Sequence, residues 1–171
     1  NLARFAETFL HLIDSNEKTA IKKIEDILNK YKKLFDQSWL IMMSMKLNLD
    51  TNNNNNEEIV KEFLDLMHIY KLDYTNTFLD LENNTLDKKI FKNWEEKYKN
   101  NKIRKFKNVN PQIIPRNHII EEIINEVYSN NYSQLYEFEK LLKNPYEKIE
   151  NKKYITPPLE SEKVFETFCG T

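Results

Sequence analysis

The residue types that most often carry chemistry are few in this sequence and lie far apart. The three histidines are His11, His68 and His118, and none forms the closely spaced pair that places two metal ligands on one face of a helix. The single cysteine, Cys169, excludes an internal disulfide and a cysteine-rich zinc site. We therefore predict no metal site in this stretch of chain.

Cys169 is nevertheless a candidate for thiol chemistry. No histidine lies near it in sequence, so the pattern of a cysteine protease is missing. The thiol follows a polar segment marked by Pro157 and Pro158 and lies close to the end of the chain, a position suited to exchange with a thiol elsewhere. A redox role and an inert thiol are both open on this evidence.

The sequence contains few features that could bind a phosphate or another anionic ligand. Phosphate-binding loops need several glycines, and Gly170 is the only one. The basic run over residues 97–107, interleaved with Tyr98 and Phe106, could contact phosphates, but a solvated helix end explains the same residues. Lys and Arg total 26 against 27 Asp and Glu, so no net field attracts nucleic acid. We predict no nucleic-acid partner.

Apolar residues recur at the three-and-four spacing of amphipathic helices, whereas alternating runs typical of strands are hard to find. We therefore expect an all-α fold. The expected helices cover residues 2–13, 17–47, 57–70, a short segment around Phe78 and Leu81, 85–98, 117–127 and 134–142.

Polar residues indicate where these helices begin and end. Side chains of the preferred N-cap types precede three of the expected helices, at Asn16, Thr75 and Ser133. Because asparagine replaces glycine most easily in the left-handed conformation, helix ends are expected at Asn48, Asn83, Asn100 and Asn130. The polar tract over residues 51–56 has nothing to bury, so we expect a flexible loop there, with its end capping the next helix.

The chain is long enough for one core: it has 171 residues, of which 40% are hydrophobic. Its apolar runs are far shorter than the ~20 residues that cross a bilayer, so we predict no membrane partner. Asn144-Pro145 ends the last expected helix. We divide the chain into a helical region over residues 1–144 and an extended tail over 145–171 that lies against another surface.

Several strings of residues resemble, in the same order, the selenoprotein O (SelO) family. The most unusual string is Asn110-Pro111-Gln112-Ile113-Ile114-Pro115-Arg116-Asn117-His118. The others are Asn1-Leu2-Ala3-Arg4-Phe5-Ala6, Asp73-Tyr74-Thr75 with Phe78, Leu141-Leu142-Lys143-Asn144-Pro145-Tyr146, Tyr154 with Pro157-Pro158, and the terminal Thr167-Phe168-Cys169-Gly170-Thr171. The resemblance spans essentially the whole chain.

The resemblance implies the helical C-terminal portion of a protein-kinase-like fold. Members of this family are pseudokinases that transfer AMP from ATP to Ser, Thr or Tyr hydroxyls of proteins with the help of Mg²⁺ or Mn²⁺. Their glycine-rich loop, catalytic lysine and metal ligands would precede Asn1, so this chain alone is expected to be inactive and to hold no cofactor. Its expected partners are the upstream kinase-like lobe and, for the longer protein, the protein substrates. The compartment would be the cytoplasm in a bacterium and the mitochondrion in a eukaryote.

The resemblance also singles out individual residues. Cys169 matches the place where some members carry selenocysteine, which favours a redox role. Asn110, Pro111, Arg116, Asn117 and His118 form the family signature, without an assigned role. For the last three of these, we weigh a surface for the kinase-like core against local capping of the helix near Asn117. An autonomous helical protein-interaction module is the alternative to an enzyme portion.

Overall fold

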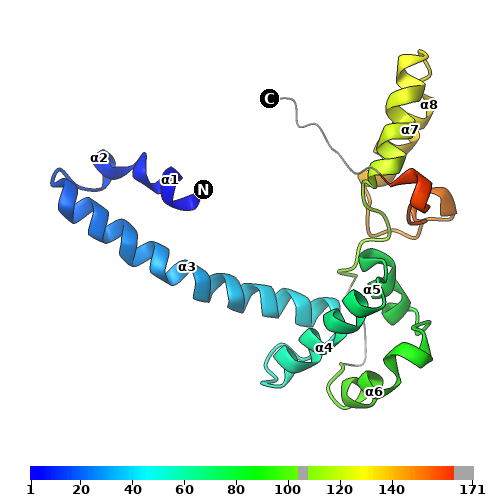
Figure 1. Cartoon of the computed structure of the whole chain (residues 1–171), viewed down its shortest axis with the longest axis horizontal. Coiled ribbons are helices and arrows are strands. Elements are labelled where there is room, and N and C mark those ends of the chain that lie inside the picture. The colour runs from blue at the N-terminus through cyan, green and yellow to red at the C-terminus, as the bar shows by residue number, and fades with distance from the viewer. Residues whose placement is uncertain (104–107, 164–171) are drawn as a thin grey trace. The chain divides into compact units, whose positions relative to one another are not determined.

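The computed structural model describes residues 1–103 and 108–163 (Figure 1). Within those ranges the chain forms eight α-helices and two 3₁₀ turns, with no β-strand, which confirms the all-α prediction. It divides into two compact units, Asn1–Ser44 and Met45–Thr171. No helix in the described ranges has the length and apolar character that a membrane crossing requires.

The first unit consists of α1 (Leu2–Glu7), α2 (Leu10–Ile13) and most of α3 (Glu17–Lys46). The prediction of a single helix over residues 2–13 is wrong, because the helix is interrupted at Thr8. The Thr8 hydroxyl donates a hydrogen bond to the Phe5 carbonyl (2.7 Å), a local contact that competes with a regular helix. The long third helix and its cap are confirmed, since Asn16 Oδ1 accepts a hydrogen bond from the Thr19 amide (3.1 Å).

The second unit begins with α4 (Asn56–Ile69), α5 (Tyr74–Glu82) and α6 (Lys88–Lys99). These helices meet around four fully buried aromatic side chains. The ring of Phe63 lies at the centre, with centroids 5.2 Å from Phe78, 5.3 Å from Phe91 and 4.8 Å from Trp94. The Trp94 indole donates a hydrogen bond to the Ile59 carbonyl (2.9 Å), so its one polar group is satisfied inside the core.

A second core lies between α7 (Asn117–Tyr128) and α8 (Ser133–Leu142), which pack as a helical hairpin (Figure 1). Residues 145–163 contain no α-helix, only the 3₁₀ turns Lys152–Tyr154 and Glu160–Glu162. Tyr154 is almost completely buried and stacks on Phe138 at 5.4 Å. The described part of the predicted tail is therefore attached to this hairpin through an aromatic anchor. The buried members of this core are Ile113, Ile119, Ile123, Phe138 and Tyr154.

Two of the predicted helix starts are wrong, because in each case an aspartate, and not a nearby threonine, caps the helix. The cap of α5 is Asp73 rather than Thr75, and its carboxylate accepts the Asn76 amide (2.8 Å). Similarly, α6 begins at Lys88 with Asp87 as its cap, not near Thr85. An ionised carboxylate accepts this hydrogen bond and also favours the positive end of the helix dipole.

The third predicted cap is also displaced. Ser133 is the first residue of α8, and its amide donates to the side chain of Asn131 (3.2 Å). Tyr132 is the N-cap of α8 and makes no side-chain cap hydrogen bond, so the side chain that binds the first amide of the helix belongs to Asn131, two positions before Ser133.

Among the described residues, three of the four left-handed positions are asparagines, as predicted, and the fourth is Lys71 (φ 51°). Only half of the predicted asparagine sites are among them. Asn48 and Asn130 have φ values of 57° and 60°, as expected. Asn83 and Asn100 are ordinary right-handed residues, and Asn84 takes the positive φ instead of Asn83. Both members of an Asn-Asn pair suit this conformation, so composition does not decide between them.

The prediction of a flexible loop over residues 51–56 is wrong at its end. Asn56 is buried as the first residue of α4, and its side chain donates to the Asp50 carbonyl (2.7 Å). Asn53 donates to the side chain of Asn101 (2.7 Å). Amide hydrogen bonds thus attach a tract that has no apolar side chain to bury.

Candidate functional site

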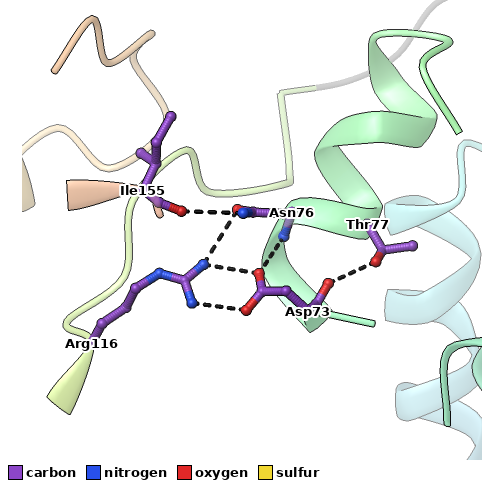
Figure 2. Close-up of polar contacts among 5 residues, drawn as sticks. All are labelled: Asp73, Asn76, Thr77, Arg116 and Ile155. Carbon is purple, nitrogen blue, oxygen red and sulfur yellow. Dashed lines mark hydrogen bonds and ion pairs between the residues drawn. The ribbon is translucent and has the colours of Figure 1, made fainter. Parts of the chain in front are cut away.

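The candidate site is built around Arg116, which stands at the N-cap position of α7 (Figure 2). The side chain makes no cap hydrogen bond and points toward α5, with only 7% of its surface exposed. Its Nη1 donates to Asp73 Oδ2 (2.8 Å) and its Nη2 donates to Asp73 Oδ1 (2.9 Å). This is the two-pronged geometry in which a guanidinium and a carboxylate bind most strongly. The capping interpretation is therefore wrong for Arg116.

Asp73 pairs with Arg116 and is also the N-cap of α5. Its carboxylate accepts the Asn76 amide, and its backbone carbonyl accepts both the amide (3.0 Å) and the hydroxyl (2.7 Å) of Thr77 (Figure 2). The first turn of α5 is thus fixed around the residue that neutralises Arg116.

Asn76 extends the site to a third segment. Its Oδ1 accepts a weaker hydrogen bond from Arg116 Nη2 (3.3 Å), and its Nδ2 donates to the Ile155 carbonyl (3.2 Å) (Figure 2). Ile155 directly follows the buried Tyr154. Segments some forty and eighty residues apart in sequence therefore meet at one polar cluster: the start of α5, the start of α7 and the segment after Tyr154.

The electrostatics of the cluster favour a charged Asp73. Partial burial alone raises the pKa of its carboxyl, but the hydrogen bonds from Arg116 and from the Asn76 amide, with the attraction of the guanidinium, outweigh this. Together they hold the pKa of Asp73 below its ordinary value of 3.8. At neutral pH the cluster is therefore an ion pair of a carboxylate and a guanidinium.

The start of the signature string connects other parts of the second unit. Asn110 is completely buried, and its Nδ2 donates to the Lys46 carbonyl at the end of α3 (3.0 Å). Next to Pro111, the Gln112 amide donates to the Pro145 carbonyl (2.7 Å). The signature string thus contacts the segment after α8, which carries another of the motifs.

Asn117 and His118 are the first two residues of α7 and line a cavity of about 400 Å³ together with Arg116, Pro158 and Glu162. Arg116 Nε and His118 Nδ1 have no hydrogen-bond partner among the described residues. The structure thus brings the last three signature residues together at one concave surface. The remaining predicted site residue, Cys169, lies outside the described residues.

The cluster does not fit a metal ion or a nucleotide phosphate. Its one carboxylate is already neutralised by Arg116, and Arg116 is already neutralised by Asp73. Across residues 1–103 and 108–163, no group of three or more His, Cys, Asp and Glu side chains is placed to hold a metal. The chemistry of the cluster is that of a structural ion pair.

Asn76 is a site residue that the sequence did not reveal, and Asp73 stood out in the sequence only through the family resemblance. An aspartate directly before a segment of apolar spacing is a helix-start signal, so Asp73 could have been identified as the cap. No signal in a single sequence pairs Asp73 with Arg116, because the two are 43 positions apart.

We predict that the ion pair stabilises the second unit far more than a surface pair does. Arg116→Met and Asp73→Asn should each lower the free energy of unfolding by about 3 kcal/mol, since each leaves one partner without its countercharge. Asp73→Asn keeps a capping acceptor, so it isolates the charge. Urea denaturation followed by tryptophan fluorescence measures both.

The matched control is Lys153→Met, which removes the exposed ion pair between Lys153 and Glu122 and should cost less than about 1 kcal/mol. The double variant Arg116→Met, Asp73→Asn should be less destabilised than the sum of the single variants. Simple additivity would show that the two side chains do not stabilise each other.

The same pair predicts a dependence of stability on pH. Because the pKa of Asp73 is depressed in the folded state, its contribution is present above the unfolded pKa of 3.8 and is lost as pH falls through the lower folded value. The difference in unfolding free energy between the parent and Asp73→Asn should be constant from about pH 5 to 7 and shrink below about pH 4. A difference that grows on acidification would contradict the assigned direction.

Comparison with known proteins places these features in a family. The family model described as protein adenylyltransferase SelO matches residues 1–95, which include Asp73 and Asn76. Proteins named protein nucleotidyltransferase YdiU, from Bacillus cereus strain AH820 and Bacillus thuringiensis strain Al Hakam, are each 33% identical over 189 residues. These alignments cover all of this chain, including Arg116, but 39% of each relative, so the chain spans well under half of their length. Because the family model matches more than half of its residues, the chain belongs to the SelO family of protein adenylyltransferases.

Proposed function

We propose that this chain is the helical C-terminal part of a longer enzyme that transfers AMP from ATP to Ser, Thr or Tyr hydroxyls of proteins. The observation that carries the proposal is the family match over residues 1–95, together with relatives named as protein nucleotidyltransferases. The share of those relatives that the chain covers, 39%, supports a partial chain whose catalytic residues lie elsewhere.

ATP and a divalent cation, Mg²⁺ or Mn²⁺, belong in this proposal to the rest of the longer protein. They would supply the AMP group and neutralise its phosphates. The described residues offer neither a cluster of metal ligands nor a free arginine at the candidate site. The contribution of this chain is mechanical: Arg116, Asp73 and Asn76 hold α5, α7 and the segment after Tyr154 in one arrangement, next to a surface lined by Asn117 and His118.

The partners in this proposal are the kinase-like lobe of the same protein and, for the whole enzyme, its protein substrates. Supporting that lobe is the role that fits a chain with two small cores, around Phe63 and around Tyr154, and no cluster of metal ligands in the part that the structure describes. Placement within a kinase-like fold is part of the proposal and rests on the family.

We further propose that Cys169 forms a disulfide with a thiol of the catalytic lobe under oxidising conditions, with an external oxidant accepting the two electrons and two protons that the thiols release. Support comes from the segment that leads to it: Tyr154 is buried in the α7–α8 core and the Ile155 carbonyl is held by Asn76. A thiol fifteen residues after the buried Tyr154 is tethered to that anchor, which raises its effective concentration near a partner within reach.

We predict that the longer protein transfers AMP and that this chain alone does not. Incubation with labelled ATP and Mg²⁺ should label protein in the first case only. Isothermal titration calorimetry of the 171-residue chain with Mg-ATP should show no specific binding, because the described residues provide no phosphate-binding loop. Micromolar binding at one site would place the nucleotide site in this chain and contradict the proposal.

We predict that Cys169→Ser in the longer protein removes the dependence of AMP transfer on redox conditions. Thr167→Ser, a conservative change two residues away, is the matched control and should leave that dependence intact. Mass spectrometry without reduction should detect a peptide in which Cys169 is joined to a second cysteine. Complete alkylation of Cys169 under oxidising conditions, with no change in the redox response of the Ser variant, would rule out the switch.

A further inference from the structure

The first unit, Asn1–Ser44, leaves an unusual amount of apolar surface uncovered. Only three of its apolar side chains, Ala20, Ile24 and Met43, are buried. Eleven large apolar side chains in the same 44 residues are exposed, among them Leu12 at 81% and Ile27 at 65%. Single exposed apolar residues are ordinary, but a contiguous set of this size marks an interaction surface.

Six of these eleven side chains line one groove. Helices α1 and α2 lie along the first half of α3 (Figure 1), and between them is a cavity of about 450 Å³. Every residue that lines the cavity is apolar or aromatic, so it suits neither a phosphate nor a charged peptide. The lining residues used below are Leu2, Phe5, Phe9, Leu12, Ile27 and Tyr31.

Helical periodicity shows that the groove occupies one side of α3. Ile24, Leu28 and Tyr31 follow the three-and-four spacing and face the groove. Nine residues after Ile24, at about 100° per residue, Lys33 falls on the opposite side and is exposed to solvent. This helix thus has one polar side that faces solvent and one apolar side on which no other segment of the first unit packs fully.

We propose that the groove formed by α1, α2 and α3 is the docking surface for the catalytic part of the same polypeptide. The larger part of each YdiU relative lies outside the region that this chain matches, so a long segment of the same polypeptide is available as the cover. An apolar face of that segment fills the groove and completes a core that residues 1–44 only begin. This inference rests on the proposed function for the identity of the segment, and it adds the surface at which the two parts join.

Site-specific photo-crosslinking in the full-length protein tests the inference. Benzoylphenylalanine is placed at Leu12, Ile27 or, as the matched control on the opposite side of the same helix, Lys33. Irradiation at Leu12 and Ile27 should join these positions to peptides from outside the 171-residue chain, within a single copy of the protein. Lys33 should give no such product.

The cross-linked products show which segment occupies the groove. Cross-links to residues 45–171, a covalently joined pair of copies, or no protein cross-link from Leu12 and Ile27 would each overturn the proposal. The same preparation is assayed for AMP transfer. Cross-links at the expected places without AMP transfer would disprove the proposed activity and leave the docking surface standing, and active enzyme without these cross-links would do the reverse.

Discussion

The second unit depends on the neutralisation of one buried cation. Arg116 is 7% exposed, and a guanidinium removed from water is tolerated only with a countercharge and hydrogen-bond acceptors beside it. Asp73 supplies the charge, and Asn76 accepts a further hydrogen bond. Because Asp73 also caps α5 and Asn76 also holds the Ile155 carbonyl, the requirement of a single side chain fixes three segments at once. The segments that carry three of the family motifs, at Asp73, Arg116 and Tyr154, thus contact one another.

Much of the fold could be predicted from the sequence, because amphipathic spacing is a strong local signal. The helices around Ile24, Phe63 and Trp94 lie close to where the apolar pattern predicts them. Their ends are less predictable, since neighbouring polar residues compete for the same amide groups. Asp73 caps α5 in place of Thr75, and Asn84 takes the left-handed conformation in place of Asn83.

The candidate site was predictable only in part. The string that ends in Arg116, Asn117 and His118 is visible in the sequence through its family resemblance. Its partner is not, because the Asp73 carboxylate is 43 positions away and nothing in one sequence encodes that contact. The burial of Tyr154 is equally hidden, since a lone aromatic residue in a polar segment shows no periodicity.

The two units differ in how completely they bury their apolar residues, and this difference fits a partial chain. The second unit has an aromatic core around Phe63 and a separate core around Tyr154. The first unit has a groove without a cover. In the proposed enzyme, one unit is a folded support held by the ion pair, and the other contributes half of an interface to the catalytic part.

Hydrogen exchange of the Arg116→Lys variant tests the central claim most directly. Lysine keeps the positive charge but cannot form the two-pronged contact with Asp73. If Arg116 holds the three segments together, amides near Asn76 and near Ile155 should lose protection in parallel, while amides of α3 around Ile24 should be unchanged. Loss of protection confined to the start of α7, with the segments at Asn76 and Ile155 as protected as in the parent, would contradict the claim.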